Sequence, residues 1–530
     1  MRRFTRSSAR SIAQWSRAVS TRAAPAGDLY RLRSILFTST GAFTGIIIGT
    51  IGSAIWFVEG AERLRADVQT PQTRPYASPA TTRKGLTVHH QGIAQIRQEL
   101  GDDAVSTDED DIEEHGFSEW STSNSLVRPE AVVRPTSTED VATIAKICFR
   151  YKIPMVPYGA GSSVEGNFSS THPGICIDLS LMDKIVEFRP DDLDVTVQAG
   201  VNWMNLNENK ELKETGLFLP LDPSPTAQIG GMIATNCSGT NALRTRRRPR
   251  KTSAGYNLNG LFTGSEGTLG IITEATLKLA VVPSSYSVAI ATFSTVKDAA
   301  DAAAKMIRQG INLAACELMD DEQMKVINKS GGVGGKLWEE LPTLFLKFSG
   351  SQQNIEDSVR SAKTVSSSSK CQTFLSAKTK EEMDSLWSAR KQALWACLAT
   401  RPEGTEIWST DVAVPISRMA QMIEESKTDA MQLGLFSSVL GHVGDGNFHQ
   451  MVMYNPKRPT DVTKVKDFIN GMMHKALEME GTVSGEHGIG IGKKHCLLEE
   501  LGPDTIGVMK AIKGRLDPHW LMNPGKIFDE

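Results

Sequence analysis

From Leu126 onward, short apolar runs alternate with segments in which apolar residues recur at helical spacing. Ser137, followed three positions later by Asp140, is typical of a helix N-terminus. The alternation restarts beyond Pro283, and the two stretches together predict an α+β protein. The expected strands are 154–157, 175–179, 195–198, 271–279, 288–293, 315–318 and 344–348, and the expected helices are one that begins after Ser137, 203–214, 296–308 and 321–329.

The stretch beyond Pro283 predicts a domain of its own, since 530 residues are too many for one hydrophobic core. Its repeating strand–helix units favour an antiparallel sheet with helices on one face. The polar stretch 59–125 contains three prolines and then the acidic run 108–111. This composition predicts a stalk that leads into a small N-terminal helical element.

The first 27 residues contain six arginines and several serines but no Asp or Glu. The formal net charge of the chain is -3, so removing these six arginines would leave -9. An arginine- and serine-rich, acid-free N-terminus is typical of a mitochondrial transit peptide. The alternative is a disordered basic tail, which the sequence disfavours because the acid-free stretch ends where the next feature begins.

Residues 35–58 carry no charge. A helix of that length would be about 36 Å long, enough to span a bilayer. Arg31 and Arg33 precede this run, and the stronger positive bias on that side favours an inner-membrane anchor with the globular body in the intermembrane space. Gly41, Gly45 and Gly49 have a spacing that allows two such helices to pack, so the sequence is compatible with a homodimer. The alternative is a sorting signal that is later cleaved.

The overall composition is that of a soluble globular protein, with 40% hydrophobic and 22% charged residues. A net charge of -3 gives no indication of nucleic-acid binding. The seven cysteines are scattered, odd in number and contain no CxxC pair. This pattern argues against a disulfide framework and against a thiolate metal site.

The candidate chemistry lies near the C-terminus, in GHVGDGNFH and SGEHGIG. His442 and His449 flank a Gly-Asp-Gly sequence at 444–446, and a hairpin there would bring both imidazoles to one side. Glu486 and His487 add a carboxylate and a third imidazole, which suits a divalent first-row metal with one group left for proton transfer. The alternative, that these histidines are structural, weakens because all four residues lie in two glycine-rich turns.

Three glycine-rich segments lie where strands of the first region are expected to end: 157–163, 228–239 and 264–270, the last of which leads directly into the expected strand 271–279. The first offers successive backbone N–H groups and two hydroxyls with no acid nearby, which suits a pyrophosphate. Each segment alone is compatible with a plain turn, but three of them in one region favour a nucleotide cofactor.

These segments resemble the FAD-dependent oxidoreductases of the vanillyl-alcohol oxidase and p-cresol methylhydroxylase type. The resemblance runs from about Leu126 to the C-terminus, and within this type the chain looks like the cytochrome-dependent D-lactate dehydrogenases of mitochondria. The motifs that carry it are PYGAGSSVEG, DPSPTAQIGGMIATNCSGTNALR, RPRKTSAGYNL, GLFTGSEGTLGI, GHVGDGNFH, GEHGIGIGK and LMNPGKIF.

The resemblance implies a two-part FAD-binding domain at 126–283, a substrate or cap domain with the metal site at 284–514, and a C-terminal return to the FAD domain at 515–530. No His or Cys lies in 157–166, so the FAD is expected to be non-covalent. The implied pyrophosphate contacts are Gly159, Gly161, Ser162 and Ser163; the residues along the flavin are Gly230, Gly231, Thr235, Ser238 and Gly239; and the site is completed by Glu266, Gly267, Ile271 and Asn523.

In the same way the resemblance implies His442, His449 and Glu486 as ligands of a divalent metal, Zn or Mn. His487 then matches the base, and Arg390 matches the arginine that binds the substrate carboxylate. The reaction implied is oxidation of D-lactate to pyruvate, with cytochrome c as electron acceptor. A D-2-hydroxyglutarate or glycolate dehydrogenase is an alternative, and so is an inactive membrane-tethered scaffold.

One departure from the family pattern lies at Leu243–Thr245. Relatives continue after Asn-Ala-x-Arg with a Tyr-Gly-Thr-like segment and a β-hairpin, whereas here Leu243-Arg244 runs directly into Thr245-Arg-Arg-Arg. The absent piece would be about two strands of ~5–6 residues each with their loops. Either the sequence lacks a coding segment, which we favour, or the protein binds FAD poorly.

Overall fold

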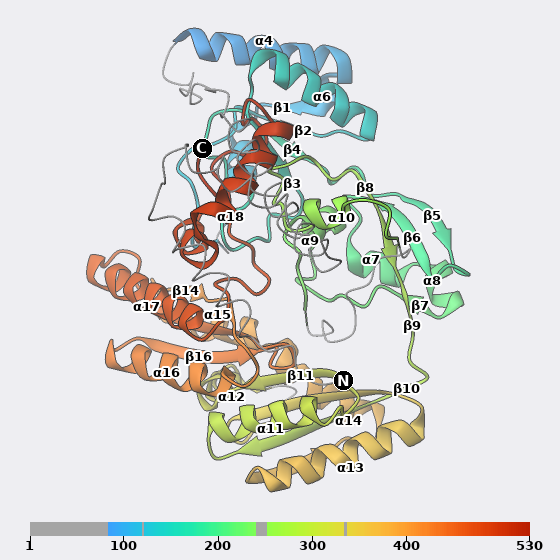
Figure 1. The fold of residues 1–530 in the computed structure, drawn as a ribbon, viewed down its shortest axis with the longest axis vertical. Coiled ribbons are helices and arrows are strands. Elements are labelled where there is room, and N and C mark those ends of the chain that lie inside the picture. Colours follow the sequence, from blue (N-terminus) through green and yellow to red (C-terminus); the bar gives the residue numbers. More distant parts are fainter. Residues whose placement is uncertain (1–82, 119–120, 240–251, 333–335) are drawn as a thin grey trace, which may run out of the picture. The chain divides into compact units, whose positions relative to one another are not determined.

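The computed structural model describes residues 83–118, 121–239, 252–332 and 336–530 (Figure 1). All of them belong to one compact unit, Thr73–Glu530. The expected transit peptide at 1–27, the expected anchor at 35–58 and the junction at Leu243–Thr245 lie outside the described residues. Among the helices that are described, none has the length and apolarity needed to cross a membrane.

A four-stranded sheet with the order β1-β2-β4-β3 forms the first part of the region that is expected to bind FAD. The pairs β2–β4 and β3–β4 are parallel, and β1–β2 is antiparallel. Helix α6 begins as predicted, with the Ser137 side chain accepting a hydrogen bond from the backbone N–H of Asp140. The elements are α4 (Arg83–Leu100), η2 (Asp102–Ala104), β1 (Val105–Ser106), α5 (Glu109–Gly116), β2 (Ala131–Val133), α6 (Thr138–Tyr151), β3 (Met155–Tyr158) and β4 (Ile175–Asp178).

This sheet begins before residue 126, since β1 pairs with β2 and α4 packs against α6. The reason is hydrophobic burial: Ile93 and Ile96 of α4 and Val105 of β1 share one core with Ile144 and Ile177. Part of the segment expected as an N-terminal element is therefore integral to the first sheet.

A second, three-stranded antiparallel sheet with the order β5-β6-β8 completes this region. The single helix expected at 203–214 is wrong, because the chain breaks at Asn209. The Asn209 side chain accepts hydrogen bonds from the N–H groups of Glu211 and Leu212, and so starts a new helix. The elements are β5 (Ile185–Arg189), β6 (Asp194–Gln198), α7 (Trp203–Glu208), α8 (Lys210–Thr215), β7 (Leu217–Phe218), α9 (Ile229–Ala234), α10 (Leu258–Phe262), β8 (Glu274–Lys278) and β9 (Ala280–Val281).

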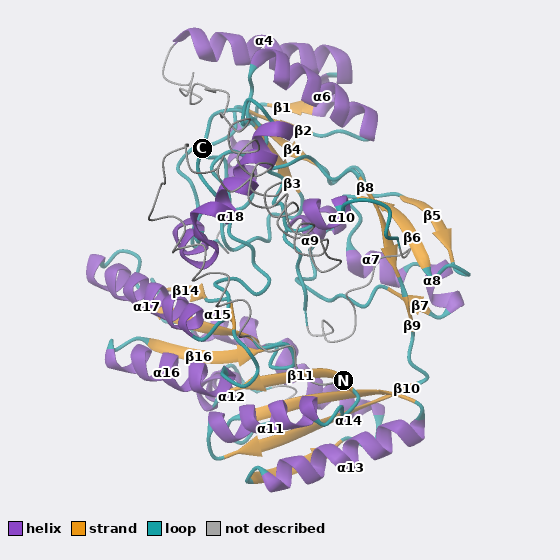
Figure 2. Cartoon of the chain, in the orientation of Figure 1, coloured by secondary structure: helices purple, strands orange, loops and turns teal. Residues whose placement is uncertain are grey.

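The second region is built on a large antiparallel sheet with the order β13-β10-β12-β11-β16-β17-β14, and β15 pairs with β17 (Figure 2). Its elements are β10 (Ser285–Phe293), α11 (Val296–Arg308), β11 (Leu313–Met319), α12 (Asp321–Lys329), β12 (Thr343–Gly350), α13 (Gln352–Ser368), β13 (Cys371–Ser376), α14 (Lys380–Lys391), α15 (Ala393–Thr400), β14 (Glu406–Ser409), β15 (Val412–Ala413), α16 (Met419–Gln432), β16 (Phe436–Gly441), β17 (Asn447–Tyr454) and α17 (Pro459–Glu478).

The expectation that helices cover one face of this sheet is wrong. Ala289 and Ala291 of β10 pack with α11, α13 and α16, whereas Val288 and Ile290 pack with α12, α14 and α15. Successive residues of a strand point to opposite faces, so a continuous apolar run such as β10 buries both. The face toward α12, α14 and α15 is called the α14 face below.

The C-terminal segment lies against the first sheet. Helix α18 (Lys494–Leu516) contains a break at Gly502, and the chain beyond it runs beside β3. The N–H of Asn523 donates to the carbonyl of Met155 and the N–H of Met155 donates to the carbonyl of Leu521, each over 2.7 Å. Asn523 is thereby held next to the glycine-rich loop that follows β3.

Candidate functional site

The hairpin of β16 and β17 brings His442 and His449 together, as the sequence predicted. Leu440 pairs with His449, and the two imidazole centroids lie 5.5 Å apart with planes at 89°. The turn requires a glycine at 446, where φ is 88° and an added Cβ would stand 2.3 Å from the carbonyl oxygen of Val414. Both histidines are buried.

The loop that follows α17 inserts Glu486 between the two imidazoles. Oε1 of Glu486 lies 3.3 Å from Nε2 of His442 and 3.1 Å from Nε2 of His449. Its other oxygen, Oε2, accepts a hydrogen bond from Ser238 over 2.6 Å. Three side chains from two distant motifs therefore converge on one point.

Hydrogen bonds to the opposite ring nitrogens fix the tautomers of both histidines. Nδ1 of His449 lies 2.8 Å from the carbonyl oxygen of Thr410, and Nδ1 of His442 lies 3.0 Å from a carboxylate oxygen of Glu317. Carbonyl and carboxylate oxygens accept hydrogen bonds, so each Nδ1 carries the hydrogen and each Nε2 presents a lone pair. Two lone pairs and a carboxylate oxygen then face one another, an arrangement that a cation or an added proton must relieve.

The pKa shifts of His442 and Glu486 agree with a site that attracts a cation. Burial lowers the pKa of His442, but Glu317 and Glu486 raise it more, so that the pKa lies well above its ordinary value. Burial raises the pKa of Glu486, yet His442 and His449 hold it well below its ordinary value. The cluster therefore attracts positive charge. Its donor set of two imidazoles and one carboxylate suits a divalent transition metal.

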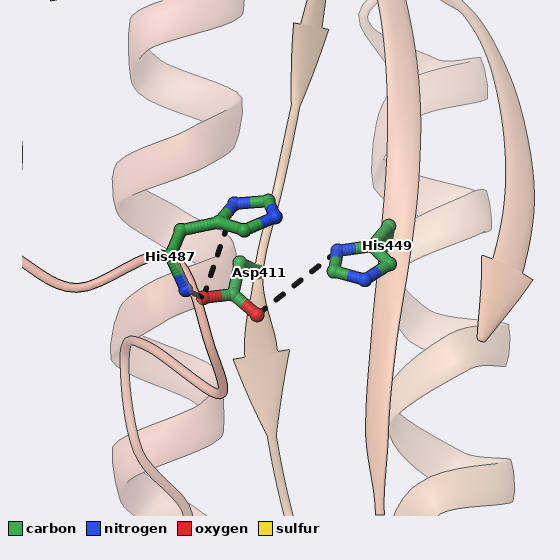
Figure 3. Close-up of side chains that lie close together, drawn as sticks. All are labelled: Asp411, His449 and His487. Atoms are coloured by element: carbon green, nitrogen blue, oxygen red, sulfur yellow. Dashed lines mark hydrogen bonds and ion pairs between the residues drawn. The ribbon is translucent and has the colours of Figure 1, made fainter. Parts of the chain in front are cut away.

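His487 stacks on His449 at 4.9 Å between centroids and 11° between planes (Figure 3). Burial is the main cause that lowers the pKa of His487, to about 4, so this imidazole is neutral near pH 7. Its Nδ1 is buried, and no hydrogen-bond partner for it is found among the described residues. A neutral imidazole with an unused nitrogen can accept a proton.

Asp411 holds the Glu486–His487 loop in place, and sequence reasoning missed it. The backbone N–H groups of Glu486 and His487 donate to its carboxylate over 3.0 and 2.9 Å, and Ser484 donates its hydroxyl over 2.9 Å. Lys493 forms an ion pair with it at 3.5 Å. Burial raises the pKa of Asp411, but the neighbouring imidazoles and Lys493 hold it far below its ordinary value.

Asp411, His449 and His487 form a second group with metal-ligating side chains (Figure 3). The bonding pattern argues against a metal there. The carboxylate of Asp411 is taken up by N–H and O–H donors, and Nδ1 of His449, which lies 4.0 Å from it, carries a hydrogen toward Thr410. Among the groups that the described residues offer, His442, His449 and Glu486 are the better metal centre.

Arg390 lies close to this centre through one bridging carboxylate. Its Nε and Nη2 are 2.9 and 2.8 Å from Oε2 of Glu317, whose Oε1 contacts His442. Glu317 was also missed from the sequence. The available signal was a single acid within the otherwise apolar run of β11, where every residue is buried.

The glycine-rich loop after β3 forms a cradle beside a buried acceptor that lacks a partner. Gly161 has φ 60°, and the Cβ of any residue replacing it would lie 2.3 Å from the hydroxyl oxygen of Tyr158. A Cβ at Gly159 would stand 3.1 Å from Oε1 of Gln228, which is buried without a hydrogen-bond partner among the described residues. Ser163 donates to Asn167, and Ser162 is partly exposed in the same loop.

The glycines of segment 228–239 differ in their surroundings, because some pack against other residues and one faces open space. A Cβ at Gly230 would stand 2.8 Å from Cβ of Ala199, so this glycine allows α9 to approach the end of β6. At Gly231 the described residues leave open space within 4 Å, and Thr235 donates its hydroxyl to the Gly231 carbonyl. Gly239 has φ 136° and lies against Asp222.

Glu266 joins the first region to the loop that carries His487. Its carboxylate accepts hydrogen bonds from the N–H groups of Ile489 and Gly490 over 2.7 and 2.8 Å. Asn523 donates to the backbone carbonyl of Glu266, and its own side-chain oxygen is buried with no partner in the described part of the chain. Gly267, with φ 71°, packs on Pro157, and Ile271 packs against the first core.

Two oriented, unpartnered amide oxygens, on Gln228 and Asn523, therefore border these glycine-rich loops. Buried acceptors of this kind are normally paired, so they indicate a missing donor. FAD carries ribose hydroxyls and a flavin N–H that can donate, and backbone N–H groups of the loop at 159–163 suit its pyrophosphate. The residues present fit the cofactor.

Two family models match the chain. "FAD binding domain" matches residues 129–246, and "FAD linked oxidases, C-terminal domain" matches residues 282–527. D-lactate dehydrogenase [cytochrome], mitochondrial, of Kluyveromyces lactis is 43% identical over 451 residues, which is 79% of this chain and 77% of the relative. The chain belongs to the FAD-linked oxidase family.

A second relative and a solved structure are also similar to the chain. The mitochondrial D-lactate dehydrogenase [cytochrome] of Arabidopsis thaliana is 41% identical, over 82% of this chain and 79% of its own. The solved structure of p-cresol methylhydroxylase with substrate bound matches with a TM-score of 0.69 at 16% identity, over 86% of this chain and 98% of that one. At that identity the match shows the fold, which is the expected p-cresol methylhydroxylase type.

The alignment with this FAD-linked oxidase of Kluyveromyces lactis also contains gaps. It runs over 451 positions but covers 79% of this chain, and 79% of 530 residues is about 419. About 32 aligned positions of the relative therefore have no counterpart here. The absent segment expected after Arg244 stays a prediction.

Proposed function

We propose that this protein oxidises D-lactate to pyruvate with non-covalently bound FAD and passes the electrons to cytochrome c. The observation that carries the proposal is the convergence of His442, His449 and Glu486 beside the neutral imidazole of His487. The relatives named D-lactate dehydrogenase [cytochrome] support the substrate and the acceptor.

The backbone of residues 159–163 would hold the FAD pyrophosphate, and Gln228 and Asn523 would pair with donors of the cofactor. The open space at Gly231 supports a close approach of a planar ring to α9. The bound flavin would supply a hydride acceptor. The substrate must therefore lie between the loop of Gly231 and the loop of His487, which the Ser238–Glu486 hydrogen bond brings together.

His442, His449 and Glu486 would hold the divalent metal, Zn or Mn, through two Nε2 atoms and one carboxylate oxygen. Such an ion would supply Lewis acidity to a coordinated hydroxyl and carboxylate. The protein's part is to fix the ligand directions, which Thr410 does for His449 and Glu317 does for His442.

His487 would take the hydroxyl proton of D-lactate as the C2–H leaves with its electron pair, so one proton and one hydride depart and pyruvate remains. Its low pKa keeps it unprotonated and ready as a base. Arg390 would bind the substrate carboxylate with the guanidinium edge that Glu317 leaves unused. Fixing the carboxylate also fixes which face of C2 the substrate presents to the acceptor.

Steady-state assays of the purified protein test this function, with D-lactate, glycolate and D-2-hydroxyglutarate as substrates and cytochrome c as acceptor. We expect the highest kcat/KM for D-lactate. Glycolate is the second candidate, because the glycolate oxidase subunit GlcD of Bacillus subtilis is 31% identical over 429 residues. A higher kcat/KM for glycolate would overturn the D-lactate assignment, and L-lactate serves as the stereochemical control.

We further propose that residues 1–27 direct the protein to mitochondria and that 35–58 anchor it in the inner membrane, as a monomer or homodimer. The sequence pattern and the mitochondrial relatives support this location. Protease treatment of mitochondria with a ruptured outer membrane should digest the catalytic body. A body that stays protected would instead lie in the matrix.

A further inference from the structure

Glu317 occupies an unusual position for a carboxylate. Its side chain is 1% exposed, and it lies in the middle of β11 between Ala315 and Met319, which belong to the core on the α14 face. Burying a carboxylate is strongly unfavourable unless cations or donors satisfy its oxygens. The partners of Glu317 therefore explain why a carboxylate occupies this buried position of β11.

Each oxygen of Glu317 contacts a different part of the candidate site. Oε1 lies 3.0 Å from Nδ1 of His442, and Oε2 lies 2.9 and 2.8 Å from Nε and Nη2 of Arg390. His442 belongs to the β16–β17 turn, whereas Arg390 lies on α14 near its C-terminal end. One carboxylate thus joins a metal-ligand histidine to an arginine about 50 positions earlier in the chain.

We propose that Glu317 is a positioning residue that couples the metal centre to the arginine that binds the substrate carboxylate. By accepting the Nδ1 hydrogen of His442, Glu317 keeps the Nε2 lone pair directed at Glu486. By holding Nε and Nη2 of Arg390, it fixes the orientation of the guanidinium and leaves Nη1 for a substrate carboxylate. The inference rests on the proposed function for the role of Arg390, but not for the effect on the metal.

The coupling sets the distance between the metal centre and Arg390, the two groups that would bind a 2-hydroxy acid. The metal centre and Arg390 cannot shift independently while Glu317 is bonded to both. A glutamine at this position cannot serve both, because its amide offers one acceptor oxygen and one NH2 donor. With its oxygen toward Arg390, the NH2 group opposes the Nδ1 hydrogen of His442; with its oxygen toward His442, the NH2 group faces the donors of Arg390.

The test measures Zn²⁺ affinity of the flavin-loaded full chain by equilibrium dialysis, for wild type, Glu317→Gln, Arg390→Met and the double variant. Glu339→Gln is the matched control, because Glu339 bonds to Thr292 and Thr373 of the same sheet, away from His442. We expect Glu317→Gln to raise the Zn²⁺ Kd by about 10–100-fold relative to the control. Arg390→Met should raise it several-fold although Arg390 has no atom at the metal centre, and the double variant should bind no more weakly than Glu317→Gln alone.

A Zn²⁺ Kd for Glu317→Gln within twofold of that for Glu339→Gln overturns the coupling, and so do fully additive effects in the double variant. If Glu317→Gln fails to fold or to bind flavin, the Zn²⁺ affinity of Arg390→Met tests the coupling instead. An Arg390→Met variant that binds Zn²⁺ as tightly as wild type also overturns the coupling. KM for D-lactate should rise in Glu317→Gln. An enzyme that is inactive on D-lactate in wild-type form, yet loses Zn²⁺ in Glu317→Gln, would refute the proposed function and leave the coupling supported.

Discussion

The hydroxyl of Ser238 donates to Oε2 of Glu486 over 2.6 Å, joining residues 248 positions apart. Ser238 belongs to a glycine-rich segment of the first region, and Glu486 is a candidate metal ligand whose other oxygen faces His442 and His449. The glycine-rich segment and the candidate metal centre are therefore in direct contact. A change on one side is expected to reach the other.

Ser238→Ala should weaken metal binding while leaving the glycine-rich loop able to hold FAD. A hydrogen bond to a charged group contributes about 1.5–3 kcal/mol, so we expect the metal Kd to rise by roughly 10–100-fold. Metal analysis after dialysis, with flavin absorbance on the same sample, measures both. Ser224→Ala is the control, since Ser224 bonds to Thr226 at an exposed position. Equal metal affinity in the two variants would show that the bond to Glu486 has no role in ligation.

His442→Ala or His449→Ala should remove the metal and most of the turnover but leave FAD bound. The reason is that both ligands lie on the β16–β17 hairpin, whereas the glycine-rich loops belong to other segments. Metal content and flavin absorbance are compared on one preparation. His474→Ala, at an exposed site on α17, is the control. Full activity after exhaustive chelation of the wild type would refute a metal role.

Asp411→Asn should lower kcat by more than about tenfold, because the amide removes the negative charge that pairs with Lys493 and keeps one acceptor oxygen where the carboxylate has two. One oxygen of Asp411 accepts from Asn447, and the other accepts from the N–H groups of Glu486 and His487. FAD should remain bound, since the contacts of Asp411 lie on the side of the metal centre. The control is Asp467→Asn, an exposed acid on α17. Turnover of Asp411→Asn equal to that of the control would mean that the loop keeps its geometry without this carboxylate.

Stability should depend on pH through His115. Burial lowers the pKa of this imidazole, but hydrogen bonds with Asp178 and the Asp111 carbonyl raise it more, so the net shift is upward from 6.5. A folded-state pKa above the unfolded value stabilises the fold fully below about pH 6.5, and this stabilisation is lost as pH rises through the folded pKa. His115→Gln should therefore lower Tm by a few degrees more at pH 6 than at pH 9. Equal Tm losses at both pH values would contradict this ionisation.

Protein from the natural source should contain an additional peptide between Asn241 and Arg246. The reason is that Leu243-Arg244 runs directly into Thr245-Arg-Arg-Arg, where the family pattern continues with a further segment. No acidic residue lies between Asp222 and Glu266, so cleavage at acidic residues keeps the junction within one fragment. Its mass should exceed the value calculated from this sequence by about two strands of ~5–6 residues each with their loops. A fragment of the calculated mass, from protein with stoichiometric FAD and normal D-lactate turnover, would show the direct junction to be functional.

Local features of the site were predictable from the sequence. The Gly-Asp-Gly turn at 444–446 predicted the hairpin that pairs His442 with His449, and Ser137 with Asp140 predicted the start of α6. Both depend on backbone preferences and hydrogen bonds over a few residues. The break at Asn209 escaped prediction, because an asparagine that begins a second helix resembles a polar position within one.

The sequence by itself determined which residue types can bind a divalent metal and a flavin, and in which turns they lie. Only the tertiary structure decided that Glu317, Asp411 and Ser238 orient them. Glu317 reaches His442 across 125 positions, and Asp411 reaches the N–H of His487 across 76. Such contacts depend on how strands and helices pack, and neither spacing nor composition encodes which acid in a buried strand meets which histidine. Burial then makes each of these hydrogen bonds strong, because no water competes for the donors and acceptors.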